Sequence, residues 1–247
     1  MNQKTHFGNK TVDSNEKQNL VNEVFHKTSG NYDLMNDIMS FGIHRHWKEK
    51  AIQNLRVTNN LTICDIAAGS GDLTKLILEK NTNSSVLMTD INSSMLNTGY
   101  NRILNECCNS MQVLPTIANA EQLPFCEKKF DRIICGFGIR NMTNMDQALK
   151  EFFRCLKPGG RLVVLEFSHI KSDPINKIYQ IYSKNIIPNL GAIVANDKDS
   201  YQYLVESIAK HPNQADFASM IRNAGFSEVA WENLSFGAVA IHSGIKL

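Results

Sequence analysis

In this 247-residue chain, the residues that most clearly suggest a ligand-binding site are two glycines and several carboxylates near the ends of predicted strands. Gly69 and Gly71 follow the apolar run 61–66, at a position where a glycine turn lets the backbone approach a ligand before a helix begins. Asp90 ends the next apolar run, where a carboxylate accepts hydrogen bonds from both hydroxyls of a ribose. This spacing indicates an adenosine site. An ordinary tight turn, with Asp90 as a helix cap, fits the same residues.

The residues around the turn favour S-adenosylmethionine over a dinucleotide as the ligand. A dinucleotide fingerprint needs a third glycine at position 74, where this chain has Thr74. Asp72 lies in the first helical turn, where its charge would repel a pyrophosphate but suit a cofactor with sulfonium and α-amino charges. Asp65, just before the turn, is predicted to orient the amino-acid end of that cofactor. Asn119 and Ala120 follow a third apolar run and are predicted to contact the adenine.

The elements that must position these residues alternate between short apolar runs and helical patterns. Such runs are typical of buried parallel strands, joined by right-handed crossovers through helices. Residues 226–234 and 236–247 lie too close together for a crossover helix, which predicts an antiparallel hairpin. We therefore expect an α/β fold with a doubly wound, mainly parallel seven-stranded sheet that ends in this hairpin. The predicted strands are 61–66, 85–90, 111–118, 130–137 and 161–168, and the helices between them are 72–80, 93–107 and 145–156.

The two remaining parts of the chain are predicted to be helical caps. Residues 1–60 form a helical N-terminal lid, and residues 61–247 form the main domain with a helical insertion at 172–224. Within this insertion, helical patterns cover 174–187, 200–211 and 214–224. We expect both caps to cover the carboxyl edge of the sheet.

Composition excludes several classes of protein. A formal charge of +2 without a basic run argues against nucleic acid as a partner. No apolar stretch approaches the roughly 20 residues that a membrane helix needs, and the N-terminus has no apolar core typical of a signal peptide. A cytoplasmic protein is the expectation. The six cysteines include no CxxC pair and are predicted to be reduced, and no metal is expected because no convincing ligand cluster is visible.

Several segments together resemble a known family, the ubiquinone/menaquinone biosynthesis C-methyltransferases among the class I, Rossmann-like methyltransferases. The most specific are YDLMNDIMSFGIHRHWK (32–48) and VANDKDSYQYLVESI (194–208), because the generic fold requires neither. The resemblance implies transfer of a methyl group from S-adenosylmethionine to a ring carbon of a polyprenylated benzoquinol or naphthoquinol. It also extends to DIAAGSGDLT (65–74), DINSSML (90–96), NAEQLPF (119–125), FGIRN (137–141) and KPGGRLVVLEFS (157–168).

Residue by residue, the resemblance implies cofactor contacts at Ser70, Asp90, Asn119 and Ala120. A further family contact, often a serine, falls on Gly136, which leaves that contact to the backbone.

The resemblance places the substrate end of the site next to Arg140 and Asn141. Arg140 is predicted to stabilise a phenolate or to position a water that removes its proton; a salt bridge at a helix start is the alternative. Tyr32 is predicted to orient the ring, and Asp33 to act as a base or proton relay, with helix capping and lid packing as their alternative.

The implied substrate carries a long hydrocarbon tail, which predicts contact with the inner face of the membrane. Apolar residues between 175 and 187 recur near helical spacing and are predicted to form a tail channel or a membrane-facing surface; a core face is the alternative. Assembly with other quinone-biosynthesis enzymes is a further expectation. The rival functions are a methyltransferase for another small molecule, a nicotinamide oxidoreductase and a non-catalytic adenosine-binding protein.

Overall fold

The computed structural model describes residues 4–28, 37, 40, 42–80, 82–107, 112–170 and 198–247. The described residues form one seven-stranded sheet with the strand order β5-β4-β3-β6-β7-β9-β8. Neighbouring strands are parallel from β5 to β7, whereas β9 is antiparallel to both β7 and β8. This arrangement confirms the predicted fold class. The strands are β3 (Thr62–Ile66), β4 (Ser85–Asp90), β5 (Val113–Ile117), β6 (Phe130–Gly136), β7 (Leu156–Phe167), β8 (Ser227–Leu234) and β9 (Val239–Ile245).

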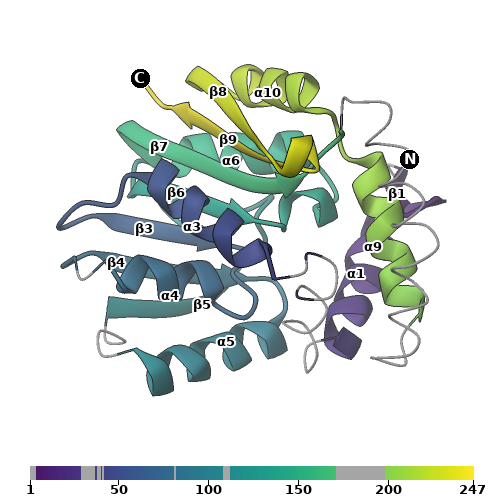
Figure 1. Cartoon of the computed structure of the whole chain (residues 1–247), viewed down its shortest axis with the longest axis horizontal. Coiled ribbons are helices and arrows are strands. Elements are labelled where there is room, and N and C mark those ends of the chain that lie inside the picture. The colour runs from purple at the N-terminus through teal and green to yellow at the C-terminus, as the bar shows by residue number, and fades with distance from the viewer. Residues whose placement is uncertain are drawn as a thin grey trace.

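The central strands are buried because helices cover both faces of the sheet. One core cluster joins the sheet to α3 (His44–Leu55), α4 (Asp72–Leu78) and α5 (Ser93–Glu106). A second cluster joins the opposite face to α6 (Met145–Cys155) and α10 (Gln214–Asn223). The molecule therefore has three layers (Figure 1). Pro115, which has no N–H for a ladder, lies in the edge strand β5.

The N-terminal segment is not wholly helical, which corrects the prediction for residues 1–60. β1 (Lys4–Phe7) and β2 (Lys10–Asp13) pair as an antiparallel hairpin before α1 (Ser14–Thr28) begins. Phe7 pairs with Lys10, so Gly8 and Asn9 form a two-residue turn. Gly8 has a φ of +56°, which such turns require and glycine adopts without strain.

The described part of the insertion is helical, as predicted. α9 (Lys198–Lys210) and α10 match the expected helices at 200–211 and 214–224 within a few residues. The expected helix at 174–187 lies outside the described residues. Figure 1 shows α9 beside β1 at one end of the sheet, where Tyr203 of α9 stacks on Phe7 of β1.

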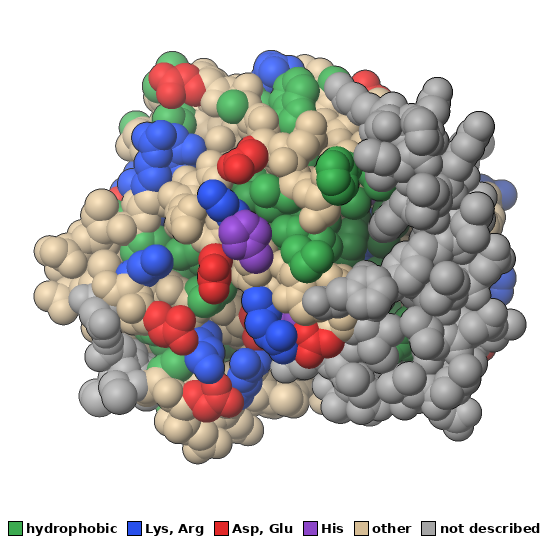
Figure 2. Space-filling view, in the orientation of Figure 1, with side chains coloured by type: hydrophobic (Ala, Val, Ile, Leu, Met, Phe, Trp, Pro, Cys, Tyr) green, Lys and Arg blue, Asp and Glu red, His purple; other side chains and the backbone are tan. Residues whose placement is uncertain are grey.

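The described surface mixes polar and apolar side chains. On the face drawn in Figure 2, charged side chains of both signs are interspersed, and apolar side chains gather near its centre. No helix within the described ranges is long and apolar enough to cross a membrane.

Candidate functional site

A cavity of about 830 Å³, including space open to solvent, lies at the carboxyl edge of the parallel strands. The loops after β3, β4, β5 and β6 all contribute to its lining. The chain winds from β3 through β4 to β5 and then crosses back to β6 on the other side of β3. Ligands of open α/β sheets bind at this kind of reversal. The predicted residues Gly69, Asp90, Asn119, Ala120 and Gly136 all line the cavity, as does Asn141.

A smaller cavity adjoins the first and contains the predicted residues Asp65 and Ser70. Gly69 and Gly136 line both cavities, so the two cavities are neighbours at the glycine turn. Gly71 is the N-cap of α4 and has a φ of +79°. It shapes the turn without belonging to either lining.

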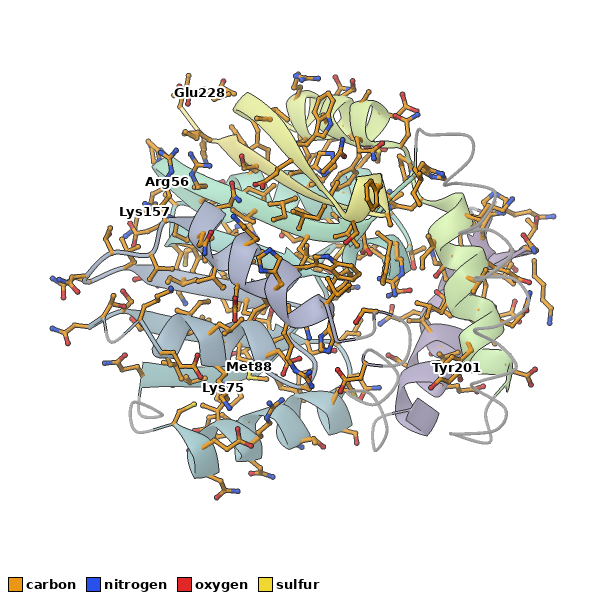
Figure 3. The ribbon with its side chains drawn as sticks, in the orientation of Figure 1. Arg56, Lys75, Met88, Lys157, Tyr201 and Glu228 are labelled. Carbon is orange, nitrogen blue, oxygen red and sulfur yellow. The ribbon has the colours of Figure 1, made fainter. Side chains whose placement is uncertain are left out.

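The turn after β3 lies close to α5 because a residue of α5 at the contact, Gly99, has no side chain. Sequence analysis did not single out this glycine. A Cβ on Gly99 would lie 2.4 Å from the Gly69 carbonyl oxygen and 2.8 Å from the Ser70 carbonyl carbon. The same Cβ would lie 2.6 Å from the end of Met88, whose position is labelled in Figure 3. Only a glycine lets α5 pack this closely on the turn.

Asp90 presents a partly buried carboxylate to the larger cavity. Its Oδ2 accepts from the Gly69 N–H at 2.9 Å, and its Oδ1 accepts from the Asn92 N–H at 2.8 Å. Burial raises its pKa despite these hydrogen bonds. The N-cap of α5 is Asn92, whose side chain accepts from the Met95 N–H, so Asp90 is not the cap of this helix.

Asp65 is fully buried beneath the turn. Its Oδ2 accepts from the Thr74 hydroxyl at 2.7 Å, while its Oδ1 has no hydrogen-bond partner among the described residues. Burial raises the pKa of this carboxyl to about 7, against the opposing effect of Thr74. A buried carboxylate oxygen without a partner fits a cationic ligand group, such as an α-amino group.

Asp72 does not carry the uncompensated charge that sequence analysis assigned to it. Its carboxylate is paired with Lys48 from α3 and, at 2.6 Å, with Arg102 from α5. Burial opposes ionisation of Asp72, but the Lys48 charge and both hydrogen bonds outweigh it and lower the pKa. The expected repulsion of a pyrophosphate is therefore weaker than predicted.

Arg140 is not among the residues that line the cavities. Its guanidinium donates to the Glu166 Oε1 at 2.8 Å, and both side chains are almost fully buried. Burial raises the Glu166 pKa, although the nearby Arg140 charge opposes this rise. The salt bridge named as the alternative is present, while the role of Arg140 in stabilising a phenolate or positioning a water stays a prediction.

Asn141 is one of the residues that line the larger cavity. It ends the single-turn helix η3 (Ile139–Asn141), and its Oδ1 accepts from the Tyr203 hydroxyl at 3.0 Å. Its Nδ2 is buried and has no hydrogen-bond partner in the part of the chain that the structure describes. Tyr32 and Asp33, the other predicted catalytic residues, lie outside the described residues.

Several lining residues were missed by sequence analysis. Gln18, Val21 and Asn22 reach the cavity from α1, and Lys48 reaches the smaller one from α3. No local pattern marks the three residues of α1, since their role depends on how this helix folds over the sheet edge, whereas Lys48 ends the segment 32–48 that the resemblance did indicate. Glu121, within a segment that the sequence did indicate, accepts from the Thr143 N–H at 2.6 Å and so ties two of the loops together.

Metal chemistry has no visible ligand set in the described residues. No group of three or more His, Cys, Asp or Glu side chains within them is placed to hold a metal ion.

Comparison with known proteins decides the family. The family model of the ubiE/COQ5 methyltransferases matches residues 11–246. The chain belongs to the ubiE/COQ5 methyltransferase family. It is 48% identical over 250 residues to the ubiquinone/menaquinone biosynthesis C-methyltransferase UbiE of Haemophilus ducreyi, covering 99% of this chain and 95% of the relative. It is 44% identical over 275 residues to a mitochondrial 2-methoxy-6-polyprenyl-1,4-benzoquinol methylase of Dictyostelium discoideum, covering 100% of this chain and 87% of the relative.

Solved structures support the fold of this ubiE/COQ5 family member. A methyltransferase of Thermotoga maritima that depends on S-adenosylmethionine superposes with a TM-score of 0.64 at 17% identity, covering 91% of this chain and 99% of the other. A similar enzyme from Aquifex aeolicus gives a TM-score of 0.59 at 13% identity, covering 81% and 89%. At these identities the likeness concerns the fold alone.

Proposed function

We propose that this protein transfers a methyl group from S-adenosylmethionine to a ring carbon of a polyprenylated quinol in ubiquinone biosynthesis, menaquinone biosynthesis or both. The observation that carries this proposal is that one cavity is lined by Asp90 and Asn119, which suit an adenosine, and by Asn141, whose buried Nδ2 has no hydrogen-bond partner among the described residues. The name of one relative gives a polyprenyl benzoquinol as the substrate, and the name of another gives ubiquinone and menaquinone biosynthesis as the pathways. The naphthoquinol is the substrate that the family resemblance implies for the menaquinone route.

The residues around the glycine turn suit S-adenosylmethionine from one end to the other. Asp90 would accept from the ribose hydroxyls, and Asn119 and Ala120 would contact the adenine. Asp65 would pair with the α-amino group through its free Oδ1, and Lys48 has the charge to attract the carboxylate. Ser70, Gly69 and Gly136 would contribute close polar and backbone contacts. The bound cofactor supplies an electrophilic methyl group.

Methylation of the ring carbon needs an electron-rich ring, which deprotonation of a quinol hydroxyl provides. The ring carbon bonds to the methyl group as the methyl–sulfur bond breaks, and the same carbon then loses its proton to restore the aromatic ring. Asn141 is the residue that the geometry favours for stabilising the resulting oxyanion, because a fixed donor in a partly closed site acts without reorganisation. Arg140 would act indirectly, by holding η3 through Glu166. Tyr32 and Asp33 remain our candidates for orienting the ring and accepting its proton.

Peripheral contact with the inner face of the membrane is part of this proposal. The polyprenyl tail partitions into the bilayer, so the enzyme must reach its surface to collect the substrate. The apolar residues between 175 and 187 are our candidate for that contact. Assembly with other quinone-biosynthesis enzymes would ease transfer of such an insoluble substrate.

Calorimetry and a transfer assay test the proposal together. We expect the purified protein to bind S-adenosylmethionine and not NAD, and to methylate short-prenyl benzoquinol or naphthoquinol analogues. Comparing the methylation rates of the benzoquinol and naphthoquinol analogues shows whether the protein acts in ubiquinone biosynthesis, menaquinone biosynthesis or both. Binding of NAD, or absence of transfer to both analogues despite cofactor binding, would contradict the proposal and favour the oxidoreductase or another small-molecule substrate.

A further inference from the structure

The family-specific segment 194–208 has a role in the site beyond covering it. α9 carries Tyr203, whose hydroxyl donates to the Asn141 Oδ1 at 3.0 Å. We infer that Tyr203 is a positioning residue, which fixes the side-chain amide of Asn141 so that Nδ2 is the atom presented to the quinol oxygen. This inference rests on the proposed function.

An asparagine amide has an acceptor end and a donor end of nearly the same shape. A rotation by half a turn would therefore present Oδ1, an acceptor, to the substrate oxygen, and an acceptor would repel a phenolate. With the amide turned, the Tyr203 hydroxyl could accept from Nδ2, but its own hydrogen and the turned Oδ1 would then both lack a partner among the described residues. The observed orientation, in which the hydroxyl donates to Oδ1, is therefore favoured. The Nδ2 atom has no other hydrogen-bond partner among the described residues.

The hydroxyl of Tyr203 remains protonated in any ordinary buffer. Burial raises its pKa to about 12, and the nearby Glu166 adds to this effect while Arg140 opposes it. The donor that orients Asn141 is thus insensitive to pH in the neutral range.

Tyr203 is itself fixed by the N-terminal hairpin. Its ring stacks on Phe7 of β1, with ring centroids 4.3 Å apart and planes 18° from parallel. The next turn of α9 is tied to the same hairpin, because the Asn9 N–H donates to Glu206 at 2.9 Å. Figure 1 shows β1 and α9 side by side at this end of the molecule. Two successive side-chain contacts, Phe7 with Tyr203 and Tyr203 with Asn141, therefore connect the hairpin to the cavity.

η3 is also held through Arg140, which contacts Glu166 of β7 and Ser207 of α9. The Arg140 N–H donates to the Glu166 Oε2 at 3.3 Å, and the Arg140 guanidinium reaches both Glu166 and Ser207. The backbone of η3 is thus tied to β7, while the side chain of Asn141 depends on α9. Loss of the Tyr203 hydroxyl should free the amide without displacing η3.

A double-mutant cycle measures this coupling. Tyr203→Phe keeps the ring stack and should lower kcat about tenfold, the equivalent of one hydrogen bond, without changing the affinity for S-adenosylmethionine. Asn141→Ala should lower kcat further, and adding Tyr203→Phe to it should cost nothing more. Independent, multiplicative losses in the double variant, or an unchanged kcat in Tyr203→Phe, would overturn the inference.

The side-chain amide of Asn141 gives a readout that does not depend on turnover. The two ¹H–¹⁵N cross-peaks of this NH2 group can be assigned by their loss in Asn141→Ala. They should shift or broaden in Tyr203→Phe. They should stay in place in Tyr100→Phe, a control on α5. An unmoved resonance in Tyr203→Phe would overturn the positioning role even if the protein methylates no quinol. A shifted resonance without quinol methylation would contradict the substrate assignment instead.

Discussion

At the residue scale, the buried charge of Asp65 lowers the stability of the folded state at a position suited to ligand binding. Its carboxyl is fully buried and keeps one oxygen without a partner in the described structure. The folded pKa of about 7 lies above the ordinary value of 3.8 because burial disfavours the charged form. From about pH 4 to pH 7 the folded state therefore retains a proton that the unfolded state releases. The contribution of Asp65 to the free energy of unfolding therefore falls as pH rises from about 4 to 7 and is constant above pH 7.

Asp65→Asn should remove this penalty, since an amide of the same shape stays neutral. We expect the variant to gain stability relative to the wild type as pH rises from 5 to 8, by roughly 2 to 3 kcal/mol over that interval. Urea unfolding at the two pH values measures the difference. The same variant should bind S-adenosylmethionine more weakly, because the partner of the α-amino group is lost. A difference in stability that does not change with pH would contradict the raised pKa.

Asp90 carries the ribose end of the cofactor site. Asp90→Ala should weaken binding of S-adenosylmethionine by roughly 1.5 to 3 kcal/mol, the range for hydrogen bonds to a charged acceptor. Asp146→Ala, in the first turn of α6 and outside both cavities, is a matched control that should leave binding unchanged. Equal affinities of Asp90→Ala and the wild type by calorimetry would remove Asp90 from the site.

At the element scale, the contact between α5 and the glycine turn links packing to function. A methyl group at position 99 would approach the Gly69 carbonyl oxygen to 2.4 Å, so either α5 or the turn must move. We expect Gly99→Ala to weaken cofactor binding at least tenfold, even though alanine favours a helix by about 1 kcal/mol over glycine. Thr98→Ala, an exposed neighbour on the same helix, should bind normally. Tight binding by Gly99→Ala, measured by calorimetry, would show that the turn tolerates displacement.

The elements differ in how far the sequence determines them. Continuous apolar runs predicted the parallel strands well, because burial on both faces leaves a strong local signal. The N-terminal hairpin was missed, although Gly8-Asn9 is a recognised hairpin turn, since its strands have only four residues each. The place of β9 between β7 and β8 has no local signal at all.

The candidate site shows the same division. Asp90, Asn119 and Gly69 were predictable because each lies at or just after the end of a strand, and these strands end at the same edge. The burial of Arg140 against Glu166 was not, because the partner lies 26 residues away at the end of another strand. The contribution of α1 also depends on long-range packing rather than on any local pattern.

At the scale of the whole molecule, low net charge bears on how the enzyme reaches its substrate. The formal charge is +2, and Figure 2 shows both signs interspersed on one face. Attraction to anionic lipids is about 1 kcal/mol per basic residue near the surface, so apolar contact should dominate. We predict vesicle binding that changes little between low and high salt and falls when Ile178 and Ile181 are both changed to Ser. Cosedimentation equal to wild type for that variant, with its fold intact, would place the contact elsewhere.

The central claim is that the methyl group is transferred to carbon. The most direct test incubates the protein with S-adenosylmethionine carrying a ¹³C-labelled methyl group and a short-prenyl quinol, and locates the label in the product by NMR. We predict a label on a ring carbon and a strongly reduced yield with Asn141→Ala. A label on a ring oxygen, or no labelled quinol in the presence of bound cofactor, would contradict it.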